Sequence, residues 1–447
     1  MEKVFRSGCA NPFLPLDIYI PDGEPKIFDG RVWLYGSKDV FGGEYCSHKY
    51  HVFSAPVDNL EEWTDHGPAF ASTDAYVQEG IWDGVPWSDG LLWAPDVAKK
   101  GDWYYLYFCL SDGSEGVARS RNPWGPFGDA RRITMGGEPI SGIDPSVLQD
   151  GEDYYYTWGQ GHCRMARLNG DMCSLDETTY VPALISHDDG REGFHEGSSL
   201  RRIGKKYCIV YASEYTDSWP NRGGAPTCLD YAVSDNVYGP YTRRGRIIDN
   251  TGIDPSSWNN HGSIIKIRDQ WYVFYHGSSN NSKYTRRCRV ERIRVDEERG
   301  LIRQAQMTSS GFADTLRPEG RTEAAWAYRV GGGAFFTERE DGHPMVHIVG
   351  DCTASYRYFD FGDSDRIWKM EIRLRRLQGG LLKIYAEEAE TACIRIEKKT
   401  EAVGDSRGEV EVISVPLGIM KGRRDLTLRF VAEHGDPICE MYDFCIS

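Results

Sequence analysis

The feature that most constrains the fold of this chain is a pattern that recurs five times in its first 310 residues. Each copy has a polar start, a short apolar run, a turn with Gly or Asp, and an aromatic-rich run, which together are typical of a β-hairpin. The copies occupy residues 24–37, 94–108, 144–158, 197–211 and 262–276. A second pair of strands is expected after most of them, for example at 51–56, 116–120, 229–234 and 288–293.

Five units of four strands, spaced by roughly 50–70 residues, predict an all-β fold with a five-bladed β-propeller over residues 1–310. Stacking blades around an axis buries their aromatic faces and leaves only short sheet edges exposed. Aromatic residues make up 13% of the chain and glycines number 49, which also argues against a helical protein. A pair of β-sandwiches could hold as many short strands, but it would not explain the repeated hairpin.

An acidic residue or a histidine precedes or opens each inner hairpin. In chain order these are Asp22, Asp96, Asp144, Glu196 and His261. Because inner strands begin at the central channel of a propeller, the five side chains are expected to converge there. Any one of them alone would more often be a turn residue. Converging carboxylates raise one another's pKa, an arrangement that is unfavourable for stability and suits acid–base catalysis.

Two carboxylates on either side of a glycosidic bond are what sugar hydrolysis requires. An inverting enzyme holds them about 6.5–9.5 Å apart to leave room for a water molecule, and a propeller channel separates side chains of different blades by a distance of that order. The base must stay ionised, whereas the acid must stay protonated near neutral pH with the help of a neighbouring charge.

At these positions the chain resembles glycoside hydrolase family 43, the five-bladed inverting hydrolases of arabinose- and xylose-containing glycans. The resemblance covers roughly residues 9–310 and rests on six motifs: Asn-Pro-Phe-Leu-Pro (11–15), Pro-Asp-Gly-Glu-Pro (21–25), Trp-Ala-Pro-Asp (93–96), Ile-Asp-Pro-Ser (143–146), His-Glu-Gly (195–197) and Asn-His-Gly-Ser (260–263). It implies that Asp22 is the general base and Glu196 the general acid, with Asp144 keeping Glu196 protonated and aimed. The base motif departs from the family's Ala-Asp-Pro-Ser by an inserted residue, so Asp17 and Glu24 remain alternative bases.

The resemblance also implies the residues that contact the sugar. It places Trp93, Asp96 and His261 at the pocket, together with an arginine after the last inner hairpin, Arg286 or Arg287, of which Arg287 is the predicted contact. In many family members the corresponding histidine lies near a calcium ion, so His261 is also the candidate metal ligand. No cofactor is expected for the chemistry, and calcium would be structural.

Aromatic rings in loops are candidates for stacking on a sugar. They are Phe41, Trp82, Trp87, Trp93, Tyr215 and Trp219. Ordinary loop packing is the alternative for each ring, and Phe41 and Trp87 are retained with Trp93 as predicted substrate contacts.

After residue 310 the pattern changes. Residues 311–332 are expected to form a linker, and the short alternating strands of 333–447 predict a jelly-roll-like β-sandwich. This region resembles a family 6 carbohydrate-binding module, although the Asn that this family often carries near its last strand is missing from Glu-Met-Tyr-Asp-Phe-Cys-Ile-Ser at 440–447. Packing against the propeller is therefore the alternative role.

The charge balance excludes some partners. The chain has 52 Lys and Arg against 67 Asp and Glu, a net charge of −15, which argues against nucleic acid or an anionic membrane as partner. We find no signal-peptide-like stretch, no membrane-spanning apolar run and no CxxC pair among the 12 cysteines. A cytoplasmic protein with buried thiols is therefore expected.

The expected function is that of an inverting exo-glycosidase, which releases terminal α-L-arabinofuranosyl or β-D-xylosyl residues from plant-derived oligosaccharides such as hemicellulose or pectin side chains. A galactose-active relative and a propeller lectin without chemistry are the alternatives. The lectin is disfavoured because both expected catalytic carboxylates are present. A sucrose-type five-bladed enzyme would carry Asn-Asp-Pro-Asn-Gly and Arg-Asp-Pro, and neither string occurs.

Overall fold

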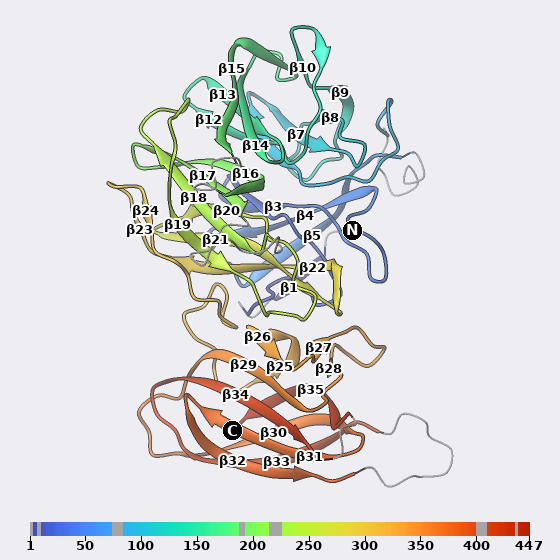
Figure 1. Cartoon of the computed structure of the whole chain (residues 1–447), viewed down its shortest axis with the longest axis vertical. Coiled ribbons are helices and arrows are strands. Elements are labelled where there is room, and N and C mark those ends of the chain that lie inside the picture. Colours follow the sequence, from blue (N-terminus) through green and yellow to red (C-terminus); the bar gives the residue numbers. More distant parts are fainter. Residues whose placement is uncertain are drawn as a thin grey trace.

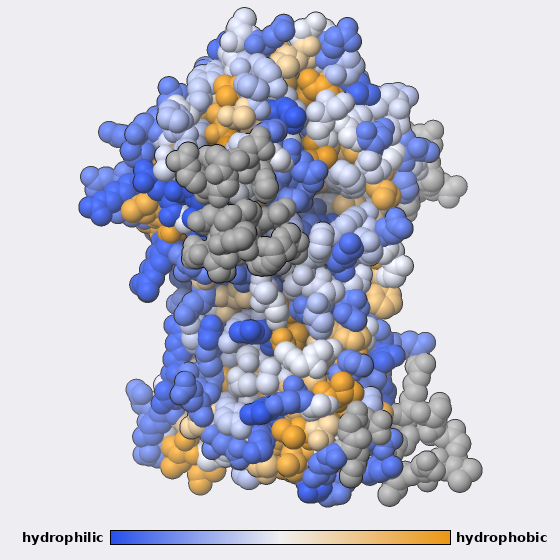
Figure 2. Space-filling model, in the orientation of Figure 1, coloured by the Kyte–Doolittle hydropathy of each residue, from blue (hydrophilic) through white to orange (hydrophobic). Residues whose placement is uncertain are grey.

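The computed structural model describes residues 3–6, 10–73, 84–186, 193–213, 226–398, 409–433 and 437–447. Nearly all regular structure in these ranges is β-strand, and the single helical element is the 3-10 turn η2 (Ala324–Trp326). Figure 1 shows the strands in two bodies, with β1–β24 in one and β25–β35 in the other. No helix in the described ranges is long and apolar enough to cross a membrane. On the face drawn in Figure 2, most side chains are hydrophilic.

Each of the five predicted repeats forms a sheet built from antiparallel hairpins. The first sheet contains β2 (Glu24–Phe28), β3 (Arg31–Tyr35), β4 (Lys49–Pro56) and β5 (Glu62–Ala71), with β1 (Lys3–Arg6) at the outer edge. The second contains β6 (Asp96–Lys100), β7 (Trp103–Cys109), β8 (Glu115–Ser120) and β9 (Gly128–Arg132). The third contains β12 (Ser146–Asp150), β13 (Asp153–Trp158), β14 (His162–Leu168) and β15 (Ser174–Ser186), extended by β10 (Thr134–Met135) and β11 (Glu138–Pro139). The fourth contains β16 (Phe194–Ile203), β17 (Lys206–Ser213), β18 (Cys228–Ser234) and β19 (Thr242–Asp249).

The fifth sheet has only three strands in the described part of the chain, where four were predicted. They are β20 (Ser263–Ile267), β21 (Gln270–Ser279) and β22 (Ser282–Ile293), and a separate hairpin, β23 (Val295–Asp296) and β24 (Leu301–Ile302), follows. The side chain of Asn11 pairs with the outer edge of β22, since its amide donates to the carbonyl of Val290 (2.7 Å) and accepts from the N–H of Val290 (2.9 Å). The N-terminal segment therefore satisfies an edge that a fourth strand would otherwise cover.

Polar contacts connect the innermost strands of the five sheets into a ring. The buried carboxylate of Asp96 accepts hydrogen bonds from Lys26 Nζ (2.9 Å) and from the N–H of Val147 (2.7 Å), which connects β6 to β2 and to β12. The N–H of Leu200 donates to Oγ of Ser146 (3.3 Å), which connects β16 to β12. The hydroxyl of Ser199 donates to Oγ of Ser263 (2.8 Å), which connects β16 to β20. A backbone bridge between Gly23 and Gly262 connects the segments that lead into β2 and β20.

Aromatic side chains fill the space between the sheets, as the repeat predicts. The second strand of every sheet carries a tyrosine that is less than 2% exposed, namely Tyr35, Tyr107, Tyr156, Tyr211 and Tyr275. Phe13 contacts Trp63 of the first sheet and Phe274 of the fifth, with ring centroids 5.0 and 5.8 Å apart. The eleven cysteines that the structure describes are free thiols, and eight of them are buried.

Two antiparallel sheets share one hydrophobic core in the C-terminal body. One contains β27 (Phe335–Phe336), β28 (Met345–Val346), β35 (Cys439–Ile446), β30 (Ile367–Arg376) and β33 (Glu411–Ile419), in that order, with β25 (Arg321–Glu323) also on β35. The other contains β26 (Arg329–Gly331), β29 (Asp351–Asp360), β34 (Arg423–Ala432), β31 (Gly380–Ala386) and β32 (Ala389–Ile396). Residues 311–332, expected to be a linker, thus contribute β25 and β26 to these sheets.

Candidate active site

A cavity of about 330 Å³ lies where inner strands of the ring begin. It brings together five residues predicted from the sequence: Asp22, Trp93, Asp144, Glu196 and His261. The rest of its lining consists of Tyr45, Cys46, Ala94, Ile143, Gln160, His195, Trp258, Asn259 and Arg286.

Asp22 is buried and held as a carboxylate. Its Oδ1 accepts a hydrogen bond from Nη1 of Arg286 (3.2 Å), and its Oδ2 accepts one from the hydroxyl of Ser37. The Asp22 N–H donates to Nδ1 of His276 (3.2 Å), whose Nε2 lies 2.8 Å from Oδ1 of Asn259. Burial would raise the pKa of Asp22, but the charge of Arg286, the hydrogen bond with His276 and the charges of the two histidines together outweigh it and hold the pKa well below its ordinary value. Asp22 therefore stays ionised at neutral pH, as a general base must.

Of the two candidate arginines, Arg286 lines the cavity, whereas Arg287, the predicted contact, does not. Successive residues of β22 face opposite sides of the sheet, so Arg286 points into the cavity whereas Arg287 lies over the ring of Tyr19, 5.2 Å from its centroid. Arg286 also donates from Nε and Nη2 to the two carboxylate oxygens of Asp39, both at 2.9 Å. This two-pronged pairing fixes the guanidinium that faces Asp22.

Asp144 is the second buried carboxylate of the cavity. Like Asp22, it has a φ of 57°, a left-handed backbone conformation that Asp tolerates better than most residues. Its Oδ2 accepts a hydrogen bond from the N–H of Gly197 (3.1 Å), the residue after Glu196. Burial raises the pKa of Asp144 to about 7, and the charges of Glu196 and Asp22 act in the same direction. Asp144 therefore takes up a proton near neutral pH, in contrast to Asp22.

Glu196 has a side chain that is 15% exposed and reaches the cavity. Its Oε2 accepts a hydrogen bond from Nε2 of Gln160 (2.7 Å) and lies 3.6 Å from Nε2 of His195. Glu196 and Asp144 belong to neighbouring sheets, and the Gly197 N–H connects their two segments. The cavity thus combines an ionised carboxylate with a carboxylate that titrates near neutrality and a partly exposed Glu, a set that can perform acid–base chemistry.

His261 lies between two carboxylates. Its Nδ1 is 3.7 Å from Oδ1 of Asp22 and 4.0 Å from Oδ2 of Asp144. Burial would lower the pKa of His261, but the charges of Asp144 and Asp22 outweigh it and raise the pKa. The described residues contain no cluster of three or more His, Cys, Asp or Glu side chains that could hold a metal ion. His261 therefore lies beside two carboxylates that favour its protonated form, and its role as a calcium ligand stays a prediction.

Several predicted site residues lie elsewhere. Asp96 is fully buried in the ring contacts and does not line the cavity, because its carboxylate is occupied by Lys26. Trp87 packs against Phe108, with ring centroids 6.2 Å apart, and Phe41 is exposed outside the cavity lining. The candidate rings Trp82, Tyr215 and Trp219 lie outside the described residues.

The alternative bases are not in the cavity. Asp17 is exposed at the surface, and Glu24 is buried in an ion pair with Arg201 of β16. The inserted residue in the base motif therefore leaves Asp22 as the carboxylate of this segment that reaches the cavity.

Several side chains of the site had no role in the sequence prediction. Among them are Tyr45, Gln160, Trp258 and His276. Tyr45 and Trp258 lie in loops, and Gln160 follows the aromatic run of the third repeat. His276 carried a usable signal, since it is a polar residue at the end of the apolar run Trp-Tyr-Val-Phe-Tyr in the fifth repeat.

Comparisons with known proteins show the family of the chain. Residues 27–299 match the sequence profile of glycosyl hydrolases family 43. A xylosidase/arabinosidase from Thermoclostridium stercorarium is 34% identical over 356 residues, which are 71% of each chain. A xylosidase/arabinosidase from Bacteroides ovatus is 27% identical over 64% of this chain and 94% of its own.

Solved structures show the same relationship. A family 43 β-xylosidase/α-arabinofuranosidase from a compost metagenome, in complex with xylotriose, is 26% identical with a TM-score of 0.53, over 68% of this chain and 98% of its own. A family 43 arabinoxylan arabinofuranohydrolase from Bacillus subtilis has a TM-score of 0.55 at 20% identity and covers 98% of each chain, which extends the similarity in fold to the C-terminal body. The chain belongs to family 43 of the glycosyl hydrolases and is a glycoside hydrolase.

Proposed function

We propose that this glycoside hydrolase is an inverting exo-enzyme that removes terminal α-L-arabinofuranosyl or β-D-xylosyl residues from plant-derived oligosaccharides. The observation that carries the proposal is the contrast between the carboxylates of the cavity, one held ionised by Arg286 and one with a pKa of about 7 beside Glu196. The names of the relatives, xylosidase/arabinosidase, support the two pentoses as the sugars released.

In the proposed reaction, Asp22 accepts a proton from a water molecule that attacks the anomeric carbon. Glu196 gives a proton to the leaving oxygen, and the Gln160 amide and the Asp144–Gly197 contact hold the Glu196 segment in position. Because Asp22 carries no proton at neutral pH, it is ready to act as base over the whole working range. The cavity, at about 330 Å³, is at the lower end of the range for small-ligand sites, which supports binding of one terminal sugar.

We further propose that the ring of five sheets is a five-bladed β-propeller and that the C-terminal body is a β-sandwich which stabilises it. The two bodies are joined by hydrogen bonds from Tyr19 Oη to Glu338 Oε2 (2.7 Å), from Asn280 N to Phe336 O (2.8 Å) and from Ser309 N to Arg357 O (2.6 Å). These contacts support a packing role for the C-terminal body.

The test is hydrolysis of aryl α-L-arabinofuranoside and aryl β-D-xyloside by the wild type, by Glu196→Ala and by the control Glu138→Ala, which alters an exposed residue outside the cavity. Glu196→Ala should lose far more activity on a substrate with a poor leaving group than on one with a good leaving group, since good leaving groups need little protonation. The anomer first released, observed by NMR, tests inversion. No turnover of either glycoside, or of arabino- and xylo-oligosaccharides, would overturn the proposal.

A further inference from the structure

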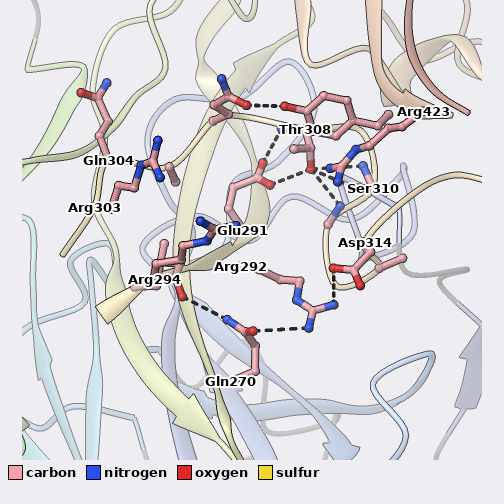
Figure 3. A pocket seen from close by; sticks show the side chains of 16 residues that line it. Gln270, Glu291, Arg292, Arg294, Arg303, Gln304, Thr308, Ser310, Asp314 and Arg423 are labelled. Atoms are coloured by element: carbon pink, nitrogen blue, oxygen red, sulfur yellow. Dashed lines mark hydrogen bonds and ion pairs between the residues drawn. The ribbon is translucent and has the colours of Figure 1, made fainter. Parts of the chain in front are cut away.

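A second, larger cavity of about 760 Å³ lies away from the candidate active site, at the junction of the two bodies (Figure 3). One wall comes from the fifth sheet, with Gln270 and Arg292. Another comes from the chain after β24, which includes Arg303, and a third from the C-terminal body, with Tyr358 and Arg423. It shares no residue with the candidate active site.

The lining of this junction cavity carries a positive charge within a chain of net charge −15. Its cationic side chains are Arg292, Arg294, Arg303 and Arg423, and its acidic ones are Glu291 and Asp314. Asp314 is paired with Arg292, at 2.6 Å, and Arg292 also donates to Gln270 (Figure 3). Burial raises the pKa of Glu291 to about 8, so this residue contributes little negative charge at neutral pH.

Three of the four arginines, Arg294, Arg303 and Arg423, have no carboxylate partner within ion-pair distance among the described residues. Arg423 lies over the ring of Tyr358. The backbones of the other two are joined by a hydrogen bond from Arg303 N to Arg294 O (3.0 Å), and their side chains are exposed. Guanidinium groups bind carboxylates through paired hydrogen bonds. These two side chains can therefore accept an anionic group without breaking an existing ion pair.

The opposite wall holds its polar groups in fixed positions. The guanidinium of Arg423 lies 3.6 Å from the centroid of the Tyr358 ring, and the hydroxyl of Tyr358 donates to Oε1 of Gln306. The amide of Gln304 also lines the cavity (Figure 3). Amide and guanidinium donors around one open space suit a ligand that carries many hydroxyls as well as a carboxylate.

We propose that the junction cavity is an accessory site for a uronic-acid-bearing oligosaccharide, with Arg294 and Arg303 receiving the uronate carboxylate. The choice of a glycan as ligand rests on the proposed function, whereas the preference for an anion rests on the lining alone. A substrate bound here by a charged branch would be retained by the enzyme independently of the catalytic cavity.

Titration calorimetry of the Glu196→Gln variant, which should not consume the ligand, tests this site. The probes are a xylo-oligosaccharide with a glucuronosyl branch, the same backbone without the branch, an oligogalacturonate and inorganic phosphate. We expect the branched ligand to bind at least about tenfold more tightly than the neutral one, and less tightly as salt is added. The substitution of Arg294→Gln with Arg303→Gln should abolish that difference.

The matched control is Arg299→Gln, an exposed arginine between β23 and β24 that pairs with Asp296 and does not line the cavity. It should leave the affinity unchanged, and neither change should alter hydrolysis of the aryl pentosides. Equal binding of branched and neutral ligands, or equal effects of the double variant and the control, would overturn the proposal. Phosphate binding as tight as uronate binding would show a general anion site instead. Because binding is measured without turnover, absence of pentosidase activity would reject only the proposed function.

Discussion

Arg286 is the residue whose removal tests the electrostatics of the site most directly. In Arg286→Met, Asp22 and Asp39 keep their burial and lose the guanidinium that both contact. We expect the variant to lose activity mainly at acidic pH, because the pKa of Asp22 would then be governed by burial and rise.

The size of the effect follows from the distance of 3.2 Å between Arg286 Nη1 and Asp22 Oδ1. At an effective dielectric constant of about 20, two unit charges at this separation interact by about 5 kcal/mol, equivalent to a change of about four in pKa. The hydrogen bond from Ser37 and the nearby charge of His261 remain. We therefore expect the acidic limb of kcat/KM against pH to rise by at least about two pH units.

Stability should change in the same experiment. In the wild type the pKa of Asp22 is lower in the folded chain than in the unfolded one, so its contribution to stability is present above about pH 4 and is lost as the pH falls. In Arg286→Met the folded pKa rises toward the unfolded one, so most of this contribution should disappear and the loss of stability on acidification should be smaller than in the wild type. Removing one partner of a buried ion pair should cost about 3–5 kcal/mol at neutral pH.

The assay is kcat/KM for an aryl pentoside from pH 4 to 8, together with thermal unfolding at each pH. Arg286→Lys keeps the charge and should retain the wild-type acidic limb with a lower rate, because it loses the two-pronged contact with Asp39. Arg287→Met is the matched control, since it removes an equally buried arginine from the other face of the same strand. A folded Arg286→Met enzyme with the wild-type acidic limb would refute the reasoning.

Three further predictions concern other parts of the ring of sheets. Gly197→Ala should cost about 1–3 kcal/mol of stability and reduce kcat. The reason is that Gly197 has a φ of +68° and that an added Cβ would lie 3.0 Å from Cγ of His261. Thermal unfolding and kinetics that match the wild type would contradict this prediction. Burial raises the pKa of Glu115 from 4.5 to about 8, so wild-type stability should fall as the pH rises between these values, and Glu115→Gln should flatten the curve of Tm against pH. Parallel curves would show that Glu115 does not titrate in this way. Trp258→Ala should raise KM for aryl pentosides at least about fivefold, because Trp258 lines the cavity. The control Phe41→Ala should change neither KM nor kcat, because Phe41 is exposed outside the cavity lining. Equal effects of the two substitutions would show that Trp258 does not contact substrate.

The parts of the structure that could be predicted from the sequence are those set by local pattern. Each aromatic hairpin buries its own tyrosine, so the number of sheets and the positions of their inner strands follow from the repeat. The carboxylates of Asp22, Asp144 and Glu196 reach one cavity because each lies at or near the start of an inner strand. The fifth sheet departs from the pattern because a side chain from a distant segment, Asn11, satisfies its outer edge.

What could not be predicted depends on partners far apart in the sequence. Asp96 occupies the same place in its repeat as the site carboxylates, but Lys26, 70 residues earlier, neutralises it and takes it out of the cavity. The choice between Arg286 and Arg287 depends on which face of β22 meets Asp39, 247 residues away along the chain. The position at the head of a repeat therefore predicts that these side chains converge. Whether a carboxylate is structural or faces the substrate depends on the charged residue that lies across the ring from it. The same distinction separates Glu24, paired with Arg201 in the ring, from Asp22, whose guanidinium partner lies in the cavity wall.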